Sequence, residues 1–422
     1  MNNGGDGAVI TSPRLLHSGE LASVLPSGGM TLVSSCSAES DLLAAEVFAA
    51  GAALGEMDFA GVFVPGLNRH DWTAGPASRV TTFFQTPEIR ARGKAARFLP
   101  LCYHDILALI RNERPRAALF MCAPPDDEGN CSFGTEVSLI AALWREIPVR
   151  IAHINPAMPR TPGDPGIPFA KLTAYYQGEQ VLRGMPVAPA DQVSASIAAN
   201  VAALIPDGAT LQTGLGKIPD AVLRTLSGHR NLRLHTGLAG DGALALVRSG
   251  AMAPSASALV GVAIGSPELY AGLADPHFQF QPVTVTHDPA TLASIAPLLT
   301  INSAMEVDLF GQAFAEASVR GFQSGPGGAS DYARAARASK GGIRIIALPA
   351  AAGIISRIVA PGAGHGPVSL SRFDIDVIVT EHGAADLRDK TYAARAAALI
   401  AIAAPEHRES LDRAWHDAAA QI

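Results

Sequence analysis

The sequence predicts an α/β protein built from two domains with largely parallel sheets. The chain has 422 residues, enough for two or three domains of ordinary size. Short apolar runs that end in Gly, Pro, Asn or Ser recur along it, and their length suits buried strands. Ala-rich stretches of helical character lie between several of these runs. Strands that alternate with helices favour parallel sheets covered on both faces.

The predicted strands include MTLVSS from Met30, GVFVPG from Gly61, AALFMCAPP from Ala117, VRIAHINP from Val149, RIIALP from Arg344 and DIDVIVTEHG from Asp374. Helices are predicted for SDLLAAEVFAAGAAL after Cys36 and for SASIAANVAALI near Ser194. The segment from Gln177 to Gln192 is polar, carries two prolines and precedes a helical run, which is typical of a linker. We therefore predict domains at residues 1–188 and 189–422.

Composition excludes several classes of protein. Hydrophobic residues make up 48% and charged residues 17%, which is a globular profile. The net charge is −6 and there is no long basic run, so neither nucleic acid nor an anionic membrane is an expected partner. The four cysteines form no CxxC pair, and neither a signal peptide nor an apolar run of 18 residues is present. We expect a cytoplasmic protein with reduced thiols and no bound metal.

Residues 209–220 are predicted to form a strand, a tight glycine turn and the start of a helix. Glycines at such a turn let the backbone approach a ligand, and free amides at the helix start favour an anionic group. Lys217 would add a positive charge beside a phosphate. The segment is neither a P-loop nor a complete dinucleotide fingerprint, so a plain strand-to-helix turn is the alternative.

A second glycine-rich turn, at residues 325–328, leads into the predicted helix ARAARASK. Such a turn can form an amide-lined concavity that binds an anion or an oxyanion. The alternative is a flexible loop followed by a helix that Ser330 or Asp331 caps.

Six segments spread over both halves carry a further signal. They are APPDDEGNCSFG (123–134), INPAMPRTPGD (154–164), IPDGATLQTGLGKIPDAVL (205–223), INSAMEVDLFGQ (301–312), SGPGGASDYARAA (324–336) and VTEHGAADLRDK (379–390). In this order and spacing they resemble the acetyl-CoA hydrolase/transferase family, which includes 4-hydroxybutyrate CoA-transferases.

The resemblance implies two α/β domains of the CoA-transferase type, with the active site at their interface, in a homodimer or a higher homo-oligomer. It implies coenzyme A, bound as an acyl-CoA substrate. The CoA-contacting positions that it implies are Gly214, Leu215, Gly216, Lys217, Ile218, Ala304, Gly327, Gly328 and Gly383.

The chain departs from the family at the nucleophile. Family transferases attack the thioester with a glutamate carboxylate, which forms an acyl anhydride and then a glutamyl-CoA thioester. The family places this glutamate in a His-Ser-Glu-Met stretch after the first glycine turn. The corresponding residues here are His235, Thr236, Gly237 and Leu238, so Gly237 stands at the nucleophile position.

Another group would have to replace the absent carboxylate. Asp241 and Glu306 are the nearest carboxylates by motif, with a loop cap and a strand-end salt bridge as their respective alternatives. The family commonly carries Tyr where this chain has His382, and Glu where it has His153. A histidine titrates near neutral pH and can activate water, whereas a hydrogen-bonded packing role is the alternative for each.

Cys36 precedes a predicted helix, whose macrodipole could lower the pKa of the thiol. The matching family loop lies near the acyl group, so a catalytic thiol is one hypothesis. We favour the other, a small buried residue that lines the acyl site.

The sequence therefore predicts an acyl-CoA-processing enzyme that acts without a glutamyl-CoA intermediate. We expect hydrolysis of the thioester, or of a carbon–carbon bond in a CoA-linked β-diketone, as in Glu-less relatives of CoA transferases that open the steroid ring. In this hypothesis His382 or His153 activates water, and amides near Gly327 and Gly383 stabilise the oxyanion. Transfer by another carboxylate and acyl-CoA binding without catalysis are the alternatives.

Overall fold

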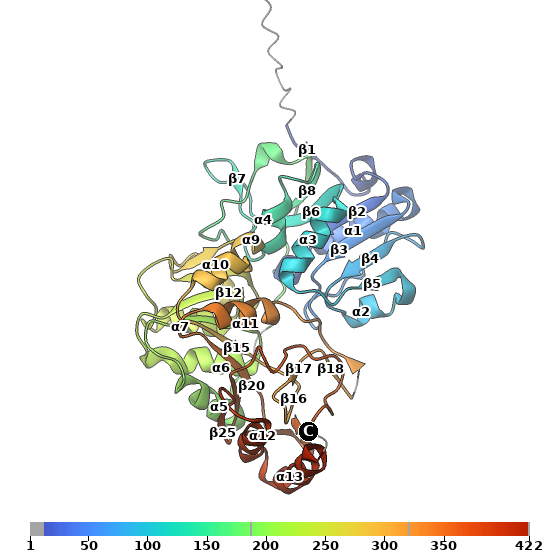
Figure 1. Ribbon diagram of the computed structural model, residues 1–422. Helices are drawn as coiled ribbons and strands as arrows, with labels where there is room; N and C mark the ends of the chain where they lie inside the picture. Colours follow the sequence, from blue (N-terminus) through green and yellow to red (C-terminus); the bar gives the residue numbers. More distant parts are fainter. Residues whose placement is uncertain (1–11, 186–187, 320, 421–422) are drawn as a thin grey trace, which may run out of the picture.

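The computed structural model describes residues 12–185, 188–319 and 321–420, and each half of the chain forms a large sheet (Figure 1). The first sheet has eight strands, all paired in parallel. In spatial order they are β1 (Arg14–Leu15), β10 (Ala174–Gln177), β8 (Val149–Ile154), β6 (Ala117–Cys122), β2 (Gly29–Val33), β3 (Met57–Gly61), β4 (Arg79–Thr82) and β5 (Ala96–Phe98).

The second sheet also has eight strands, and among them only the pair β24–β25 is antiparallel. In spatial order they are β14 (Phe278–Phe280), β13 (Ala258–Ala263), β12 (Arg233–Ala239), β11 (Thr210–Thr213), β15 (Leu298–Asn302), β20 (Ile343–Ala347), β24 (Val377–Thr380) and β25 (Gly383–Asp386). The predicted α/β class with largely parallel sheets is confirmed.

Helices connect the strands and begin at residues that suit helix starts. Ser40, Asp191 and Ser266 each accept a hydrogen bond from a first-turn amide of the helix that follows. The helices are α1 (Asp41–Ala50), α2 (Pro87–Arg90), α3 (Tyr103–Glu113), α4 (Ser138–Leu143), α5 (Gln192–Ala202), α6 (Lys217–Thr225), α7 (Asp241–Arg248), α8 (Pro267–Gly272), α9 (Val283–Thr286), α10 (Pro289–Ser294), α11 (Ala329–Ala338), α12 (Tyr392–Ala401) and α13 (Pro405–Ala419).

Short strands build the hairpins and loops outside the two sheets. They are β7 (Asn130–Cys131), β9 (Ile167–Pro168), β16 (Glu306–Asp308), β17 (Ala313–Phe314), β18 (Ala317–Ser318), β19 (Gly321–Phe322), β21 (Ala351–Ala352), β22 (Ile355–Ser356) and β23 (Ile358–Val359).

One predicted strand is displaced. The apolar run from Gly61 begins where β3 ends, so the strand is Met57–Gly61 and the run itself forms a loop. Val62 and Phe63 of this loop are buried in the hydrophobic core, and Val64 and Pro65 line a cavity between the two halves. Burial at an interface and burial in a sheet leave the same apolar pattern in the sequence.

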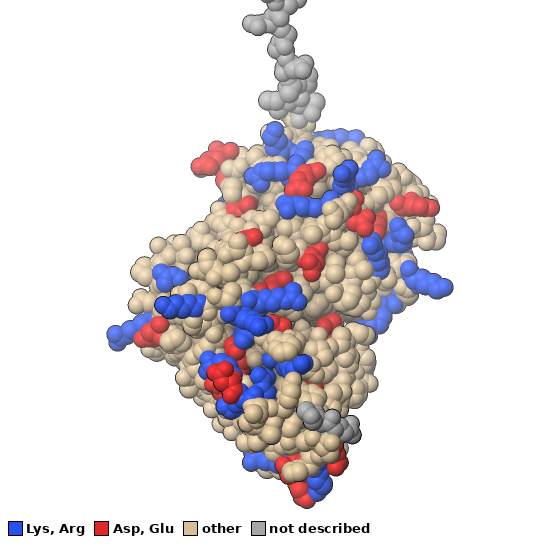
Figure 2. Space-filling view, viewed as in Figure 1, with Lys and Arg blue, Asp and Glu red and all other residues tan. Residues whose placement is uncertain are grey.

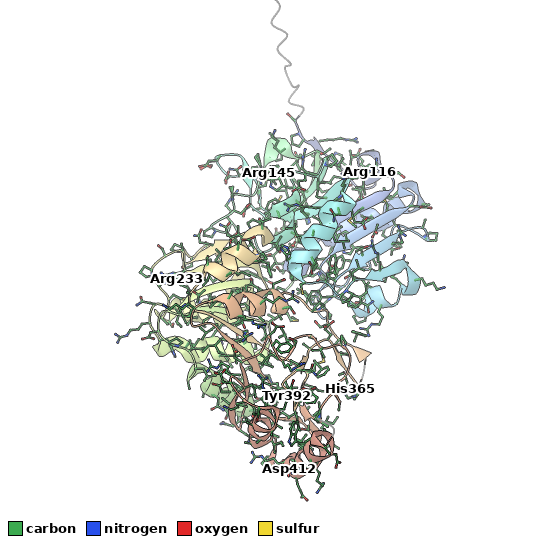
Figure 3. The ribbon with its side chains drawn as sticks, in the orientation of Figure 1. Arg116, Arg145, Arg233, His365, Tyr392 and Asp412 are labelled. Carbon is green, nitrogen blue, oxygen red and sulfur yellow. The ribbon has the colours of Figure 1, made fainter. Side chains whose placement is uncertain are left out.

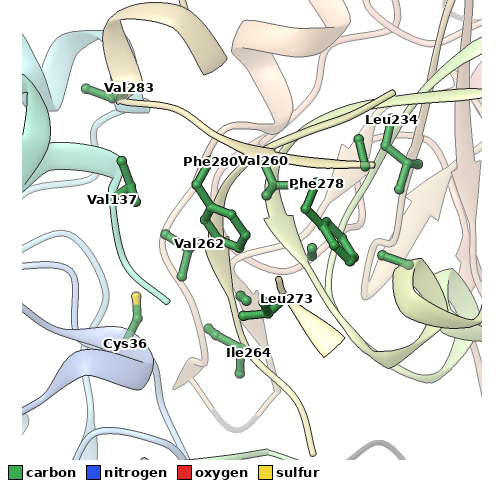
Figure 4. Packing of buried hydrophobic residues seen from close by; sticks show 14 of the residues in the cluster. Cys36, Val137, Leu234, Val260, Val262, Ile264, Leu273, Phe278, Phe280 and Val283 are labelled. Carbon is green, nitrogen blue, oxygen red and sulfur yellow. The ribbon is translucent and has the colours of Figure 1, made fainter. Parts of the chain in front are cut away.

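The hydrophobic core crosses from one half to the other. Cys36 and Val137 of the first half belong to the same buried cluster as Val262 and Phe280 of the second (Figure 4). Such a shared core favours a fixed arrangement of the two halves over free rotation. The predicted domain boundary at residues 188 and 189 stays a proposal; it falls between β10 and α5, beside residues 186–187, which lie outside the described residues.

The surface in Figure 2 carries Lys and Arg side chains interspersed with Asp and Glu side chains. This face therefore has no extended patch of a single charge sign. None of the helices in the described ranges has the length and apolar character required to cross a membrane.

Candidate active site

A cavity of about 320 Å³ lies between the two halves, at the carboxyl ends of β11, β12, β13 and β15. Open parallel α/β sheets bind ligands at this edge. The second half contributes strand ends and both glycine turns. The first half closes the cavity with Cys36, Val64, Pro65, Phe84 and Tyr103.

The first glycine turn reaches the cavity through its backbone. Gly214 and Leu215, which follow β11, line the wall. Gly216 has φ +125°, which favours glycine, and borders a smaller adjoining hollow. The Lys217 ammonium lies 3.1 Å from the Asp191 carboxylate and is not part of the cavity wall. The predicted positive charge is therefore paired at the surface.

The second glycine turn, residues 325–328, also lines the cavity, and it precedes α11. The first amides of α11 have no partner within the helix and are available to a ligand. Neither predicted capping residue caps this helix. Ser330 donates to the Ser369 carbonyl, and Asp331 accepts from the backbone amide of Tyr103 at 3.0 Å. Burial raises the pKa of Asp331 to about 6.

Besides Gly216 and Lys217, three more predicted CoA-contacting positions lie outside the cavity wall. Ile218 belongs to the main hydrophobic core, and Ala304 packs against the apolar cluster around β16 and α12. Gly383 begins β25, the strand at the far edge of the second sheet.

The space beside Gly237 is occupied by an imidazole. Gly237 lies in β12 and lines the cavity. A Cβ atom added there would lie 2.6 Å from Cε1 and 2.9 Å from Nε2 of His287. A Cβ atom at Gly328 would lie 2.6 Å from the same Nε2. The His287 ring thus fits between two residues that have no side chain.

Aromatic contacts hold the His287 ring. It stacks on Tyr103 with the ring centroids 4.6 Å apart, and its edge contacts Tyr332 at 4.9 Å. Nδ1 lies 2.9 Å from Oγ1 of Thr286, whose hydroxyl donates to the Pro282 carbonyl at 3.4 Å. A hydroxyl that donates its proton there accepts one from Nδ1–H. In this tautomer the lone pair lies on Nε2, the nitrogen close to Gly237 and Gly328.

His287 is neutral at ordinary pH. Burial, together with a smaller contribution from the nearby His235, lowers the pKa of His287 to about 3. The ring of His235 is also buried, which lowers its pKa, and its Nε2 has no hydrogen-bond partner among the described residues. The site therefore contains two uncharged imidazoles next to the position predicted for the family nucleophile.

The cavity floor carries a fixed pair of amides. The Gln212 side chain donates to Asn302 at 3.2 Å, and the Asn302 side chain donates back at 3.0 Å. Both residues line the cavity. Because each amide orients the other, their remaining donors and acceptors have defined directions toward a ligand.

The two histidines predicted as catalytic lie away from the cavity. His153 is buried in β8, where Nδ1 lies 2.8 Å from Ser40 Oγ and Nε2 lies 3.0 Å from the Gly178 carbonyl. His382 lies in the turn between β24 and β25, with Nε2 3.9 Å from the Glu381 carboxylate. Neither belongs to the cavity wall. The contacts of His153 match the packing alternative.

The two substitute carboxylates also have local partners. Asp241 begins α7 and accepts from the hydroxyl of Ser266 at 2.6 Å and from its amide at 3.1 Å. Glu306 is buried in β16 and lies 2.9 Å from Nδ1 of His365, a residue labelled in Figure 3. Neither carboxylate lines the cavity. They fit the loop-cap and salt-bridge alternatives.

Cys36 lies in the cavity wall, within the 3₁₀ turn η2 (Cys36–Ala38). Burial raises the pKa of its thiol well above the usual range, and the Glu136 carboxylate raises it further. A nucleophilic thiol requires the opposite shift. Cys36 therefore suits the role of a small wall residue.

The residues that sequence reasoning missed are His287, Tyr103 and Tyr332. They come from three separate segments, and no motif connects them in the sequence. The described residues contain no group of three or more His, Cys, Asp or Glu side chains arranged to hold a metal ion.

Comparison with known proteins places the chain in a family. Residues 265–415 match the acetyl-CoA hydrolase/transferase C-terminal domain. A 4-hydroxybutyrate coenzyme A transferase of Clostridium kluyveri is 35% identical over 327 residues, which cover 75% of this chain and 76% of that protein. An acetyl-CoA hydrolase of Eremothecium gossypii is 28% identical and covers 58% of this chain and 51% of its own length.

The solved structures agree with the fold. RipA from Yersinia pestis superposes with a TM-score of 0.85 at 27% identity, and the match covers 96% of this chain and 97% of RipA. The relatives include both CoA transferases and acetyl-CoA hydrolases, which use CoA thioesters. Because the match to the 4-hydroxybutyrate coenzyme A transferase covers about three quarters of both proteins at 35% identity, the chain belongs to the acetyl-CoA hydrolase/transferase family.

Proposed function

We propose that this protein is an acyl-CoA-processing enzyme that hydrolyses its substrate without a covalent glutamyl intermediate. The observation that carries the proposal is the pair Gly237 and His287. The predicted nucleophile position has no side chain, and an uncharged imidazole fills the space beside it. Hydrolysis needs a base for water at this place and no carboxylate nucleophile.

In the proposed reaction, the backbone of both glycine turns holds the CoA end, and the thioester carbonyl lies near Gly237. Nε2 of His287 accepts a proton from water while the water oxygen attacks the carbonyl carbon. The first amides of α11, next to Gly327 and Gly328, stabilise the oxyanion. The developing oxyanion stabilises the imidazolium that forms beside it. The same attack on a ketone carbonyl would cleave a CoA-linked β-diketone.

The test is turnover of an acyl-CoA panel in ¹⁸O-labelled water, with and without acetate, followed by mass spectrometry. We expect ¹⁸O in the released carboxylate and no acetyl-CoA. The panel should include a β-diketone thioester, whose cleavage would place the label in the acid released from the carbon–carbon bond.

Two other results would contradict this proposal. Acetate-dependent formation of acetyl-CoA without water-derived label would mean that another carboxylate carries out CoA transfer. Tight binding of acyl-CoA without turnover of any panel member would mean that the chain only binds the thioester.

A further inference from the structure

Glu136 is a buried carboxyl group that the proposed reaction has not used. It comes from the first half of the chain but pairs with the second sheet, opposite Val262 in an antiparallel bridge. The Val137 amide donates to the Gly261 carbonyl at 3.1 Å, and the Ala263 amide donates to the Thr135 carbonyl at 2.8 Å. Residues 135–137 thus continue the edge of β13 beyond the end of β14.

This register directs the Glu136 side chain toward the cavity side of the sheet. Residues directly opposite each other on paired strands project to the same face. Val262 is opposite Glu136 on one side and opposite Leu238 of β12 on the other. Both Val262 and Leu238 line the cavity. The carboxyl group therefore lies on the face where the substrate binds.

The contacts of the carboxyl group indicate a functional role. Its Oε2 accepts from the Ser35 amide at 3.2 Å, and Cys36, the next residue, lines the cavity. No cation forms an ion pair with it among the described residues. Burial raises the pKa of Glu136 to about 8, so the group is protonated at neutral pH. A buried carboxyl without a cationic partner destabilises the fold on ionisation and is a frequent mark of a reactive site.

The titratable groups that face Glu136 are neutral as well. They are the Cys36 thiol of η2 and the Tyr103 phenol of α3, whose pKa values are raised by burial. His287, beyond Tyr103, is kept neutral by its low pKa. Glu136 is not itself part of the cavity wall, but it bonds to Ser35, the residue before the wall residue Cys36. The wall base His287 has no proton and the nearby acid Glu136 has one, which are the two states that general acid–base catalysis requires.

We propose that Glu136 is the general acid of this enzyme and delivers a proton to the leaving sulfur. The inference rests on the hydrolytic function proposed above. The water oxygen forms the new bond to the carbonyl carbon, and His287 takes the first water proton. As the C–S bond breaks, its electron pair stays on sulfur, which receives the carboxyl proton of Glu136. The proton on His287 then returns to Glu136 through solvent, and the products are a carboxylic acid and free CoA thiol.

The test compares wild-type protein with Glu136→Gln, which keeps the shape and the acceptor for the Ser35 amide but has no acidic proton. We expect kcat for an acyl-CoA thioester to fall by about 100-fold, with KM little changed. The wild-type rate should decline above about pH 8, where Glu136 ionises, and the variant should lose this decline.

A change of leaving group separates proton donation from a structural role. The 4-nitrothiophenyl ester of the same acyl group releases a much more acidic thiol, which needs no proton as it departs. We expect E136Q to hydrolyse this ester at nearly the wild-type rate. Equal losses on both thioesters, or no loss on either, would overturn the assignment.

The control is Glu46→Gln, which removes a carboxylate buried in α1 that accepts from the Tyr176 hydroxyl at 3.0 Å, far from the cavity. It should leave both rates and the alkaline decline unchanged. If E136Q does not fold, Glu136→Asp should show the same dependence on the leaving group, because its carboxyl group is withdrawn from the sulfur. A wild-type protein that incorporates no ¹⁸O refutes the hydrolytic function itself, whereas a hydrolysing wild type with an unaffected E136Q refutes only the role of Glu136.

Discussion

Replacing His287 with glutamine is expected to lower kcat for acyl-CoA hydrolysis by about 100- to 1,000-fold. Glutamine has a similar length and can hydrogen-bond to Thr286, but it cannot accept a proton from water. Because binding of the CoA end depends on the glycine turns, KM should change little. Steady-state kinetics measure the effect. His229→Gln, which replaces a partly buried histidine bonded to the Ile205 carbonyl, serves as the control.

The same substitution should change the response of the fold to acid. The pKa of His287 is about 3 in the folded chain, against a reference value of 6.5. Between pH 6.5 and about pH 3 this histidine is protonated in the unfolded chain but not in the folded chain. The free energy of unfolding therefore decreases as the pH falls through this range. In the wild type this decrease amounts to about 2 kcal/mol at pH 5, and H287Q does not undergo it. Thermal melts at pH 7 and pH 5 should show a smaller decrease for the variant. Equal decreases, or an unchanged kcat, would show that His287 is not the buried base.

Glutamate introduced at position 237 is expected to support CoA transfer only when His287 is also removed. In Gly237→Glu the new Cβ would lie 2.6 Å from Cε1 of His287, so the ring or the strand must move. Such overpacking costs about 1–3 kcal/mol. The single variant should melt at a lower temperature and should not transfer CoA to acetate.

The double variant G237E/H287A has room for the carboxylate. It should form acetyl-CoA from an acyl-CoA and acetate, and mass spectrometry of the intact protein should detect covalently bound CoA. Gly240→Glu is the matched control, since a Cβ there has no atom nearer than 3.7 Å and adds the same charge elsewhere in the second half. Transfer by G237E alone would mean that the ring moves aside readily. No transfer by the double variant would mean that position 237 does not correspond to the family nucleophile.

The sequence predicted much of the fold because its strand signals are local. The buried runs AALFMCAPP and VRIAHINP contain β6 and β8, which begin at the predicted residues and end two or three residues before the runs do. The residue pattern predicted both glycine turns, and an ungapped count from Gly214 in the first turn placed Gly237 at the position of the family nucleophile. The run from Gly61 was misassigned because a strand and an interface loop are equally apolar.

The chemical groups around Gly237 could not be predicted in the same way. His287, Tyr103 and Tyr332 meet only after α9, α3 and α11 have packed together. The histidines that stood out in the sequence, His153 and His382, differ from the family in residue type, but that difference says nothing about the direction of a side chain. His153 bonds to Ser40, and this contact exists only in the folded chain.

The pairing of residues 135–137 with β13 has a consequence for how the whole chain unfolds. Two-domain enzymes commonly open and close about a hinge, because few backbone bonds join their domains. Here a segment of the first half supplies backbone hydrogen bonds to the sheet of the second, and the Ser37 hydroxyl adds a bond to the Ala263 carbonyl at 2.7 Å. Separating the halves would expose sheet edges as well as apolar side chains. The protein should therefore melt in a single cooperative transition, and the cavity should keep its shape from one turnover to the next.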